Sequence, residues 1–203
     1  LADDLTQEAV FELFIRRLPR ERSFLVAAGL EQLLDTIELL RYGEAELEVL
    51  ANAGFGDKLL NYLRTFRFTG QVHAPPEGTI CFPQEPLVRI TAPLPAAQLL
   101  ETRAINLVQF QTMIAAKAAR MVLAAPGKQL VDFGLRRAHG AEAGLLSARA
   151  SYLVGFAGTS DVLAHQRWSL PMFGTMAHAF VEAHDDEEQA FLAFARANPR
   201  EVV

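Results

Sequence analysis

Residues that could bind an anion follow three short apolar runs in the second half of the sequence. The runs 130–133, 152–154 and 170–173 lead into Gly134-Leu135-Arg136-Arg137, Gly155-Phe156-Ala157-Gly158-Thr159-Ser160 and Gly174-Thr175-Met176-Ala177-His178. Their spacing is about that of a strand plus a crossover helix, which parallel strands require. Active sites of parallel α/β barrels lie at the carboxyl ends of the strands, so we expect a phosphate-binding enzyme site at one rim.

The arginine pair and the glycine-rich turn are two candidate anion sites. Arg136 and Arg137 directly follow an apolar run, and a guanidinium matches a carboxylate or phosphate with two parallel hydrogen bonds. The alternative is an ordinary solvated pair. The turn 155–160 precedes a helical segment whose first amides could meet an anion. Ser160 could instead be only the N-cap, with Asp161 complementing the helix dipole.

His178 is the candidate catalytic residue, because a histidine beside a turn can act as a nucleophile or a general base. Its apolar neighbours also allow a buried structural histidine. His178 and His184 are six residues apart, on different sides of a helix, and no carboxylate cluster supplies a third ligand. We therefore expect no protein metal site.

Composition argues against nucleic-acid-binding, disulfide-bonded and membrane-spanning classes of protein. The 203 residues have a net charge of −5, which argues against a general nucleic-acid surface. A single cysteine excludes an intrachain disulfide and suits a reducing compartment. No stretch approaches the roughly 20 apolar residues of a membrane span, and the start does not resemble a signal peptide. We expect a cytoplasmic enzyme without nucleic-acid or membrane partners.

The pattern of elements predicts an α/β protein in three segments. Residues 1–94 mix strands near 10–15, 24–28 and 70–91 with helices near 30–40, 47–50 and 59–63, as in an α+β domain. Residues 95–127 predict one long connecting helix, apolar around much of its circumference and therefore buried. Residues 128–203 predict the first βα units of an incomplete parallel α/β barrel, ending in an acidic helix over 185–197 and a strand that opens at Val202.

Several ordered motifs resemble those of the nicotinate phosphoribosyltransferase family. They span nearly the whole chain: 9–14, 28–30, Pro76-Glu77-Gly78-Thr79, 106–112, 117–120, Asp132-Phe133-Gly134-Leu135-Arg136-Arg137-Ala138-His139-Gly140, 152–164 and 174–178. The resemblance implies a type II phosphoribosyltransferase-like barrel joined to a smaller α+β part. It also implies the ATP-coupled synthesis of nicotinate mononucleotide and pyrophosphate from nicotinate and phosphoribosyl pyrophosphate, in the salvage route to NAD.

The resemblance also implies roles for single residues. His178 would be the histidine that ATP phosphorylates, and Thr175 would contact nicotinate, with Gly174 in the same turn. Phe133 would lie near the pyridine ring, while Arg136 and Arg137 would face the anionic substrates. Mg²⁺ would accompany the polyphosphates, held largely by substrate oxygens.

The resemblance further implies a truncated chain that lacks the family's N-terminal start and C-terminal half. We expect such a chain to be inactive alone and to form a homodimer or to associate with a complementary half. Two alternatives stay open here. One is a non-catalytic chain that binds a full-length homologue, and the other is a related phosphoribosyltransferase for nicotinamide or quinolinate.

Overall fold

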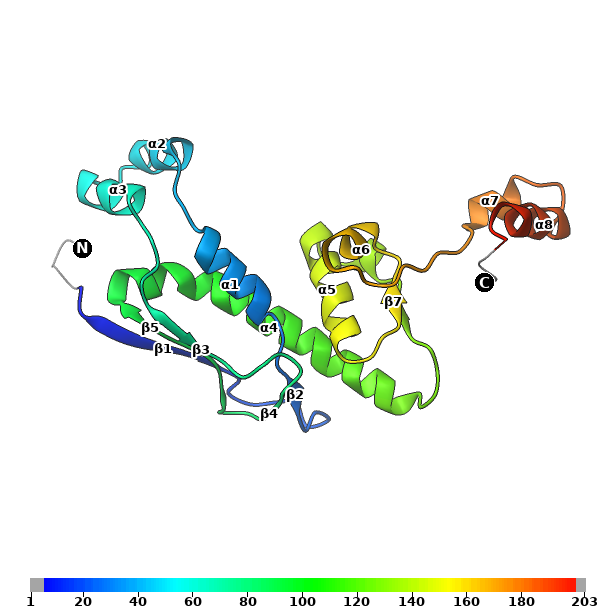
Figure 1. Ribbon diagram of the computed structural model, residues 1–203, viewed down its shortest axis with the longest axis horizontal. Helices are drawn as coiled ribbons and strands as arrows, with labels where there is room; N and C mark the ends of the chain where they lie inside the picture. The colour runs from blue at the N-terminus through cyan, green and yellow to red at the C-terminus, as the bar shows by residue number, and fades with distance from the viewer. Residues whose placement is uncertain (1–5, 200–203) are drawn as a thin grey trace.

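The computed structural model describes residues 6–199. Its central element is the helix α4, Leu94–Ala124. Figure 1 shows a small sheet on one side of the first part of α4, short helices on its other side, and a second group of elements beside its last part. The predicted α/β class is confirmed, and so is the predicted long helix within 95–127, which the structure has at Leu94–Ala124.

The first part of the chain forms an antiparallel sheet in the order β1-β5-β3. Strand β1 (Glu8–Phe14) pairs with β5 (Pro86–Pro93), with Phe11 opposite Ile90, and β3 (Gln71–His73) pairs with the other edge of β5. Alternate residues of β1 are half-buried, as expected of a strand that packs one face on a core. That face lies on α4.

Three short helices and a second, two-stranded sheet complete this part. The helices are α1 (Leu30–Leu39), α2 (Glu44–Asn52) and α3 (Asp57–Arg64), and the strands are β2 (Leu25–Val26) and β4 (Ile80–Cys81). All five elements lie where the apolar periodicity predicts them. The sequence patterns that define them are local, so no distant partner is needed to recognise them.

Helix α4 is buried on several sides because it packs between the sheet, α1 and the second part of the chain. Buried side chains occur along most of its length, Leu100, Leu107 and Ala115 among them. The chain turns into α1 so close to α4 that a Cβ on Gly29 would lie 2.7 Å from the Leu107 carbonyl oxygen. Gly29 also has φ +98°, so this position favours glycine for two reasons.

The second part begins with parallel strands. Strand β6 (Val131–Asp132) pairs in parallel with β7 (Gly158–Thr159), and Thr159 forms a parallel bridge with Met172. The chain between and after them forms the 3-10 turn η1 (Leu135–Arg137) and the helices α5 (Ala141–Leu153), α6 (Val162–Trp168), α7 (His178–Glu182) and α8 (Glu187–Ala197). The parallel βα pattern expected of an opening barrel is therefore present.

The prediction of a strand at 152–154 is wrong. Tyr152 and Leu153 are the last residues of α5, and the strand next to β6 is Gly158–Thr159. A short apolar run is compatible with a helix end as well as with a strand, and periodicity cannot separate them. The run 170–173 contributes only the bridge at Met172. The strand expected at Val202 lies outside the described residues.

The division of the chain into segments at 1–94, 95–127 and 128–203 remains a prediction, because no observation tests these boundaries.

Within residues 6–199 no helix is long and apolar enough to cross a membrane.

An ion-pair cluster joins the two parts of the chain. Arg149 of α5 donates to both oxygens of Glu77, at 3.0 and 2.6 Å, and also pairs with Glu31 of α1. The Glu77 carboxylate in turn accepts the backbone amides of Gly29 and Leu30 at the N-terminus of α1. There it also complements the positive end of the helix dipole.

The cluster is largely removed from solvent, and this affects its titration. The side chains of Arg149 and Glu77 are 10% and 15% exposed. Burial by itself would raise the pKa of Glu77, but the hydrogen bonds and charge of Arg149, with the amides of Gly29 and Leu30, bring that pKa below its ordinary value of 4.5. The ionised carboxylate therefore stabilises the folded chain.

We expect Glu77→Gln to lower the free energy of unfolding at pH 7 by about 3 kcal/mol, near the lower end for a broken buried pair, because Arg149 keeps Glu31. A carboxyl whose pKa is lowered by folding adds stability above its unfolded pKa and loses it as the pH falls through the folded one. The difference between the two proteins should therefore be full above about pH 4.5 and shrink below it. Urea unfolding of both proteins at several pH values measures this difference in the free energy of unfolding.

The matched control is Glu12→Gln, because Glu12 pairs with Arg89 at 2.6 Å on the exposed sheet surface. It should cost less than about 1 kcal/mol. Equal costs for the two substitutions would contradict a special role for Glu77.

Candidate active site

The residues singled out in the sequence line one open cleft of about 840 Å³ at the carboxyl end of the parallel strands. Its wall comes from three separate segments, namely the end of β6 with η1, the residue after β7, and the chain that leads into α7. The lining residues are Phe133, Leu135, Arg136, Arg137, Ser160, Thr175, Met176, Ala177 and His178. The expectation that these segments share one rim therefore agrees with the structure.

Hydrogen bonds of Asp132 shape the first segment. One Asp132 oxygen accepts the Gly134 amide at 3.0 Å, and the other accepts the Thr159 hydroxyl at 3.4 Å. The Thr159 oxygen also accepts the Asp161 amide at 3.0 Å. These bonds link the ends of β6 and β7 and fix the backbone that enters η1. As a result, Arg136 and Arg137 both lie at the cleft.

The charge of the cleft favours an anion. Arg136 and Arg137 are exposed, and no acidic side chain among the described residues lines the cleft. Within residues 6–199 neither guanidinium makes an ion pair. Two unpaired guanidiniums beside the aromatic ring of Phe133 suit a ligand that combines negative charge with a flat apolar group.

The glycine-rich turn does not provide an anion site at a helix N-terminus. Asp161, rather than Ser160, is the N-cap of α6, and its carboxylate accepts the amides of Leu163 and Ala164. This negatively charged cap occupies the position that an anion would take. Ser160 remains in the wall of the cleft.

His178 is exposed and is the first residue of α7, so the alternative of a buried core histidine is wrong. Thr175 and His178 both line the cleft, whereas Gly174 precedes Thr175 and is not part of the lining. The strand-end turn expected at 174–178 is an irregular segment that leads into a helix. In Figure 1 this segment extends away from the parallel strands to α7 and α8.

Residues 6–199 contain no group of three or more His, Cys, Asp or Glu side chains that could hold a metal ion. The positioning roles of Asp132 and of the pair Arg149–Glu77 are evident only in the structure. In the sequence, Glu77 stands only within a motif of the family resemblance. A carboxylate directly after a strand was the available indication for Asp132, while nothing local connects Glu77 with Arg149.

Two family models match this chain. The model of the nicotinate phosphoribosyltransferase N-terminal domain matches residues 1–109, and that of the nicotinate phosphoribosyltransferase family matches residues 128–199. The chain belongs to the nicotinate phosphoribosyltransferase family. The resemblance seen in the motifs is thereby confirmed.

Relatives and solved structures agree with this assignment. A nicotinate phosphoribosyltransferase of Mycobacterium tuberculosis is 50% identical over 199 residues, which are 98% of this chain and 43% of the relative. One of Bacillus subtilis is 41% identical over 95% of this chain and 39% of its own length. The chain thus spans less than half the length of these relatives.

Human nicotinic acid phosphoribosyltransferase superposes with a TM-score of 0.82 at 38% identity, over 90% of this chain and 37% of the human chain. A nicotinate-nucleotide pyrophosphorylase of Pyrococcus furiosus superposes with a TM-score of 0.76 at 24% identity and shows the fold alone. The α/β fold expected of a type II phosphoribosyltransferase is therefore confirmed.

We expect Gly158→Ala to disrupt the parallel strands below the cleft. A Cβ at Gly158 would lie 2.1 Å from the Pro171 carbonyl oxygen and 2.7 Å from the Phe173 ring, so the bridge to Met172 would have to open. The cost should be roughly 3 kcal/mol or more, at the upper end for overpacking. Gly174→Ala is the control, because a Cβ there meets nothing within 4 Å. The melting temperature of Gly158→Ala should be clearly lower than that of Gly174→Ala. Equal melting temperatures would contradict the close approach of Gly158 to the Pro171 carbonyl oxygen.

Proposed function

We propose that this chain is the substrate-binding part of a nicotinate phosphoribosyltransferase, which forms nicotinate mononucleotide and pyrophosphate from nicotinate and phosphoribosyl pyrophosphate. One observation supports this most strongly. The cleft of this family member combines Arg136, Arg137, Phe133, Thr175 and His178 in one wall without an acidic side chain. Such a wall suits two anionic substrates, one of them aromatic. The family match favours nicotinate over the nicotinamide and quinolinate alternatives.

In this proposal the side chains bind and orient the substrates. Arg136 and Arg137 balance the negative charge of phosphoribosyl pyrophosphate and the nicotinate carboxylate, and Phe133 contacts the pyridine ring. Thr175 hydrogen-bonds nicotinate, with Gly174 directly before it in the irregular segment that leads into α7. The pyridine nitrogen then attacks the anomeric carbon as the bond to pyrophosphate breaks. The arginines stabilise the charge that develops on the leaving group, and the walls of the cleft keep water from the carbon centre.

ATP coupling is a further part of the proposal. An imidazole nitrogen of His178 would accept the γ-phosphoryl group of ATP and release ADP, and water would later hydrolyse the phosphohistidine. The exposed position of His178 at the cleft allows ATP to reach the ring. The described residues offer no protein ligand set for Mg²⁺, so the ion would be held by oxygens of the polyphosphates.

A cytoplasmic location and a homodimer, or association with a complementary half, belong to the same proposal. The described residues leave large apolar side chains exposed on α8, where Phe191 and Leu192 are about half accessible. Such a surface suits contact with further protein. A non-catalytic chain that binds a full-length homologue remains the alternative, and the two experiments below separate the two functions.

We expect Arg137→Ala to weaken the binding of phosphoribosyl pyrophosphate by roughly 2 to 5 kcal/mol, the usual scale for removing one partner of a desolvated charge pair. Titration calorimetry should be made on this chain and on a chimera that continues it with the rest of the Mycobacterium tuberculosis relative. Arg64→Ala is the control, because Arg64 of α3 pairs with the exposed Glu44 and does not line the cleft. Equally small effects would mean that Arg137 is only a solvated surface residue.

We also expect γ-labelled ATP to give the chimera an acid-labile label on His178. His178→Asn should abolish both the label and the ATP coupling, and its circular dichroism should be unchanged because the side chain is exposed. His184→Asn is the matched control, since His184 lies on the same exposed segment and bonds only the Phe180 carbonyl oxygen. Label that persists in His178→Asn at the original level would rule out this role, and binding without any activity would favour the non-catalytic alternative.

A further inference from the structure

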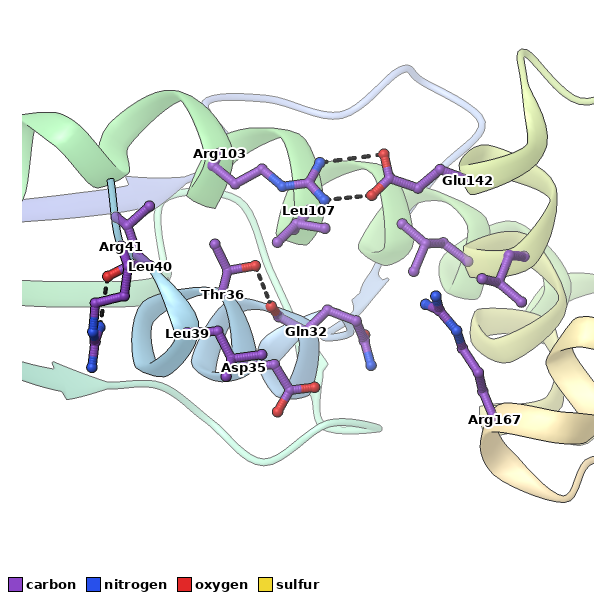
Figure 2. A pocket seen from close by; sticks show the side chains of 12 residues that line it. Gln32, Asp35, Thr36, Leu39, Leu40, Arg41, Arg103, Leu107, Glu142 and Arg167 are labelled. Atoms are coloured by element: carbon purple, nitrogen blue, oxygen red, sulfur yellow. Dashed lines mark hydrogen bonds and ion pairs between the residues drawn. The ribbon is translucent and has the colours of Figure 1, made fainter. Parts of the chain in front are cut away.

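A second cavity, of about 520 Å³, lies between α1, α4, α5 and α6 and shares no lining residue with the first cleft. Figure 2 shows its walls, with Gln32 and Asp35 on α1, Arg103 and Leu107 on α4, and Arg167 on α6. Its size is within the range of small-molecule sites, which are mostly apolar and contain a few convergent polar groups.

Among the three arginines that line this cavity, Arg167 is the one without a hydrogen bond or ion pair in the described part of the chain, although its positive charge, after the Arg103 hydrogen bond, helps to lower the pKa of Glu142. Arg103 forms an ion pair with Glu142 and donates a hydrogen bond to the Asn106 side chain at 2.8 Å. Arg41 donates to the Leu40 carbonyl oxygen at 2.6 Å. No hydrogen bond or ion pair within residues 6–199 involves the Arg167 guanidinium. Figure 2 shows this side chain extending from α6 into the cavity, toward the space beside Gln32. A planar guanidinium in this position can bind a carboxylate with two hydrogen bonds.

The Gln32 amide is also unsatisfied. Its nitrogen and its oxygen are both buried, and neither has a hydrogen-bond partner in the described structure. The Thr36 hydroxyl donates to the Gln32 backbone carbonyl, so it does not compensate the side chain. An unpaired buried polar group costs about 1 to 3 kcal/mol, and an occupant that offers it an oxygen would remove part of this cost.

Leucines form the apolar part of the wall, which also contains Asp35, Thr36 and Glu142. They are the accessible Leu39 with Leu40 at the end of α1, and Leu107, Leu145 and Leu146 of α4 and α5, which are nearly fully buried. In formal charge the lining has three arginines against the two carboxylates of Asp35 and Glu142, which leaves one positive charge. The matching ligand therefore has one negative charge and an apolar body.

We propose that this cavity is a binding site for a small apolar monocarboxylate, distinct from the cleft at His178. Its carboxylate lies between the Arg167 guanidinium and the Gln32 amide, and its apolar body lies on the leucines of the lining, chiefly Leu39 and Leu40 at the end of α1. The site is independent of the proposed reaction, because it uses none of the residues assigned to nicotinate or phosphoribosyl pyrophosphate.

The test is titration calorimetry of the 203-residue chain with cyclohexanecarboxylate, whose puckered ring differs from a flat pyridine. We expect saturable binding that Arg167→Met weakens about tenfold or more, the scale of a hydrogen bond to a charged group. Gln32→Met should weaken it several-fold. Arg41→Met is the matched control in the same lining and should change the affinity less than about twofold, since Arg41 is exposed and engaged elsewhere.

Three comparisons make the result specific. Cyclohexylmethanol, which lacks the charge, should bind about tenfold more weakly or worse. Inorganic phosphate should not compete, because it has no apolar body. Arg137→Ala should leave the binding unchanged, which separates this site from the first cleft and from any failure of the proposed reaction.

The proposal is overturned if cyclohexanecarboxylate does not bind, if Arg167→Met binds like the unaltered chain, or if only Arg137→Ala weakens the binding. Competition by phosphate would overturn the proposed ligand class. Because Arg167 is exposed, Arg167→Met should fold normally. If circular dichroism shows otherwise, Arg167→Lys replaces it and should still weaken the binding, since an ammonium lacks the planar fork.

Discussion

The guanidinium of Arg149 is the point at which the two parts of the chain are tied together. It reaches from α5 to Glu77 and Glu31 of the first part, and it lies 5.7 Å from the centre of the Trp168 ring of α6. Because Glu77 also accepts amides at the start of α1, a single carboxylate fixes α1 relative to α5. Removing either ion would cost stability, because each partner is largely buried and would keep only its remaining contacts, Glu31 for Arg149 and the two amides for Glu77.

The cleft depends on this constraint through α5. Helix α5 begins just after η1 and packs against it, and η1 presents both cleft arginines. The parallel strands beneath are only two residues long, so the strand ladder by itself contributes few hydrogen bonds. Side-chain bonds of Asp132 and Thr159 supplement it. The positions of the residues that line the cleft are thus set largely by side chains that do not line it themselves.

The cationic groups that this chain leaves accessible are guanidiniums rather than helix N-termini. Asp161 already occupies the start of α6, and Glu77 does the same for α1. Two helix dipoles are therefore satisfied within the protein, and the cationic side chains remain for ligands. Both cavities fit this pattern, since the first cleft presents Arg136 and Arg137 and the second cavity presents Arg167.

The sequence by itself determined the class of fold, the family, several of the helices and the three segments that line the cleft, whereas Gly174 lies outside the lining and α7 begins where a strand-end turn was expected. Apolar periodicity is local, so α1, α4 and α8 could be placed from their own residues, and consecutive motif residues stay together in space. Only the tertiary structure decided that 152–154 ends a helix, that Gly158–Thr159 forms the strand, and that Asp161 caps α6. A two-residue strand exists only through its partners, and Arg149 meets Glu77 across 72 positions of sequence. Such contacts depend on packing between distant segments, which no local pattern records.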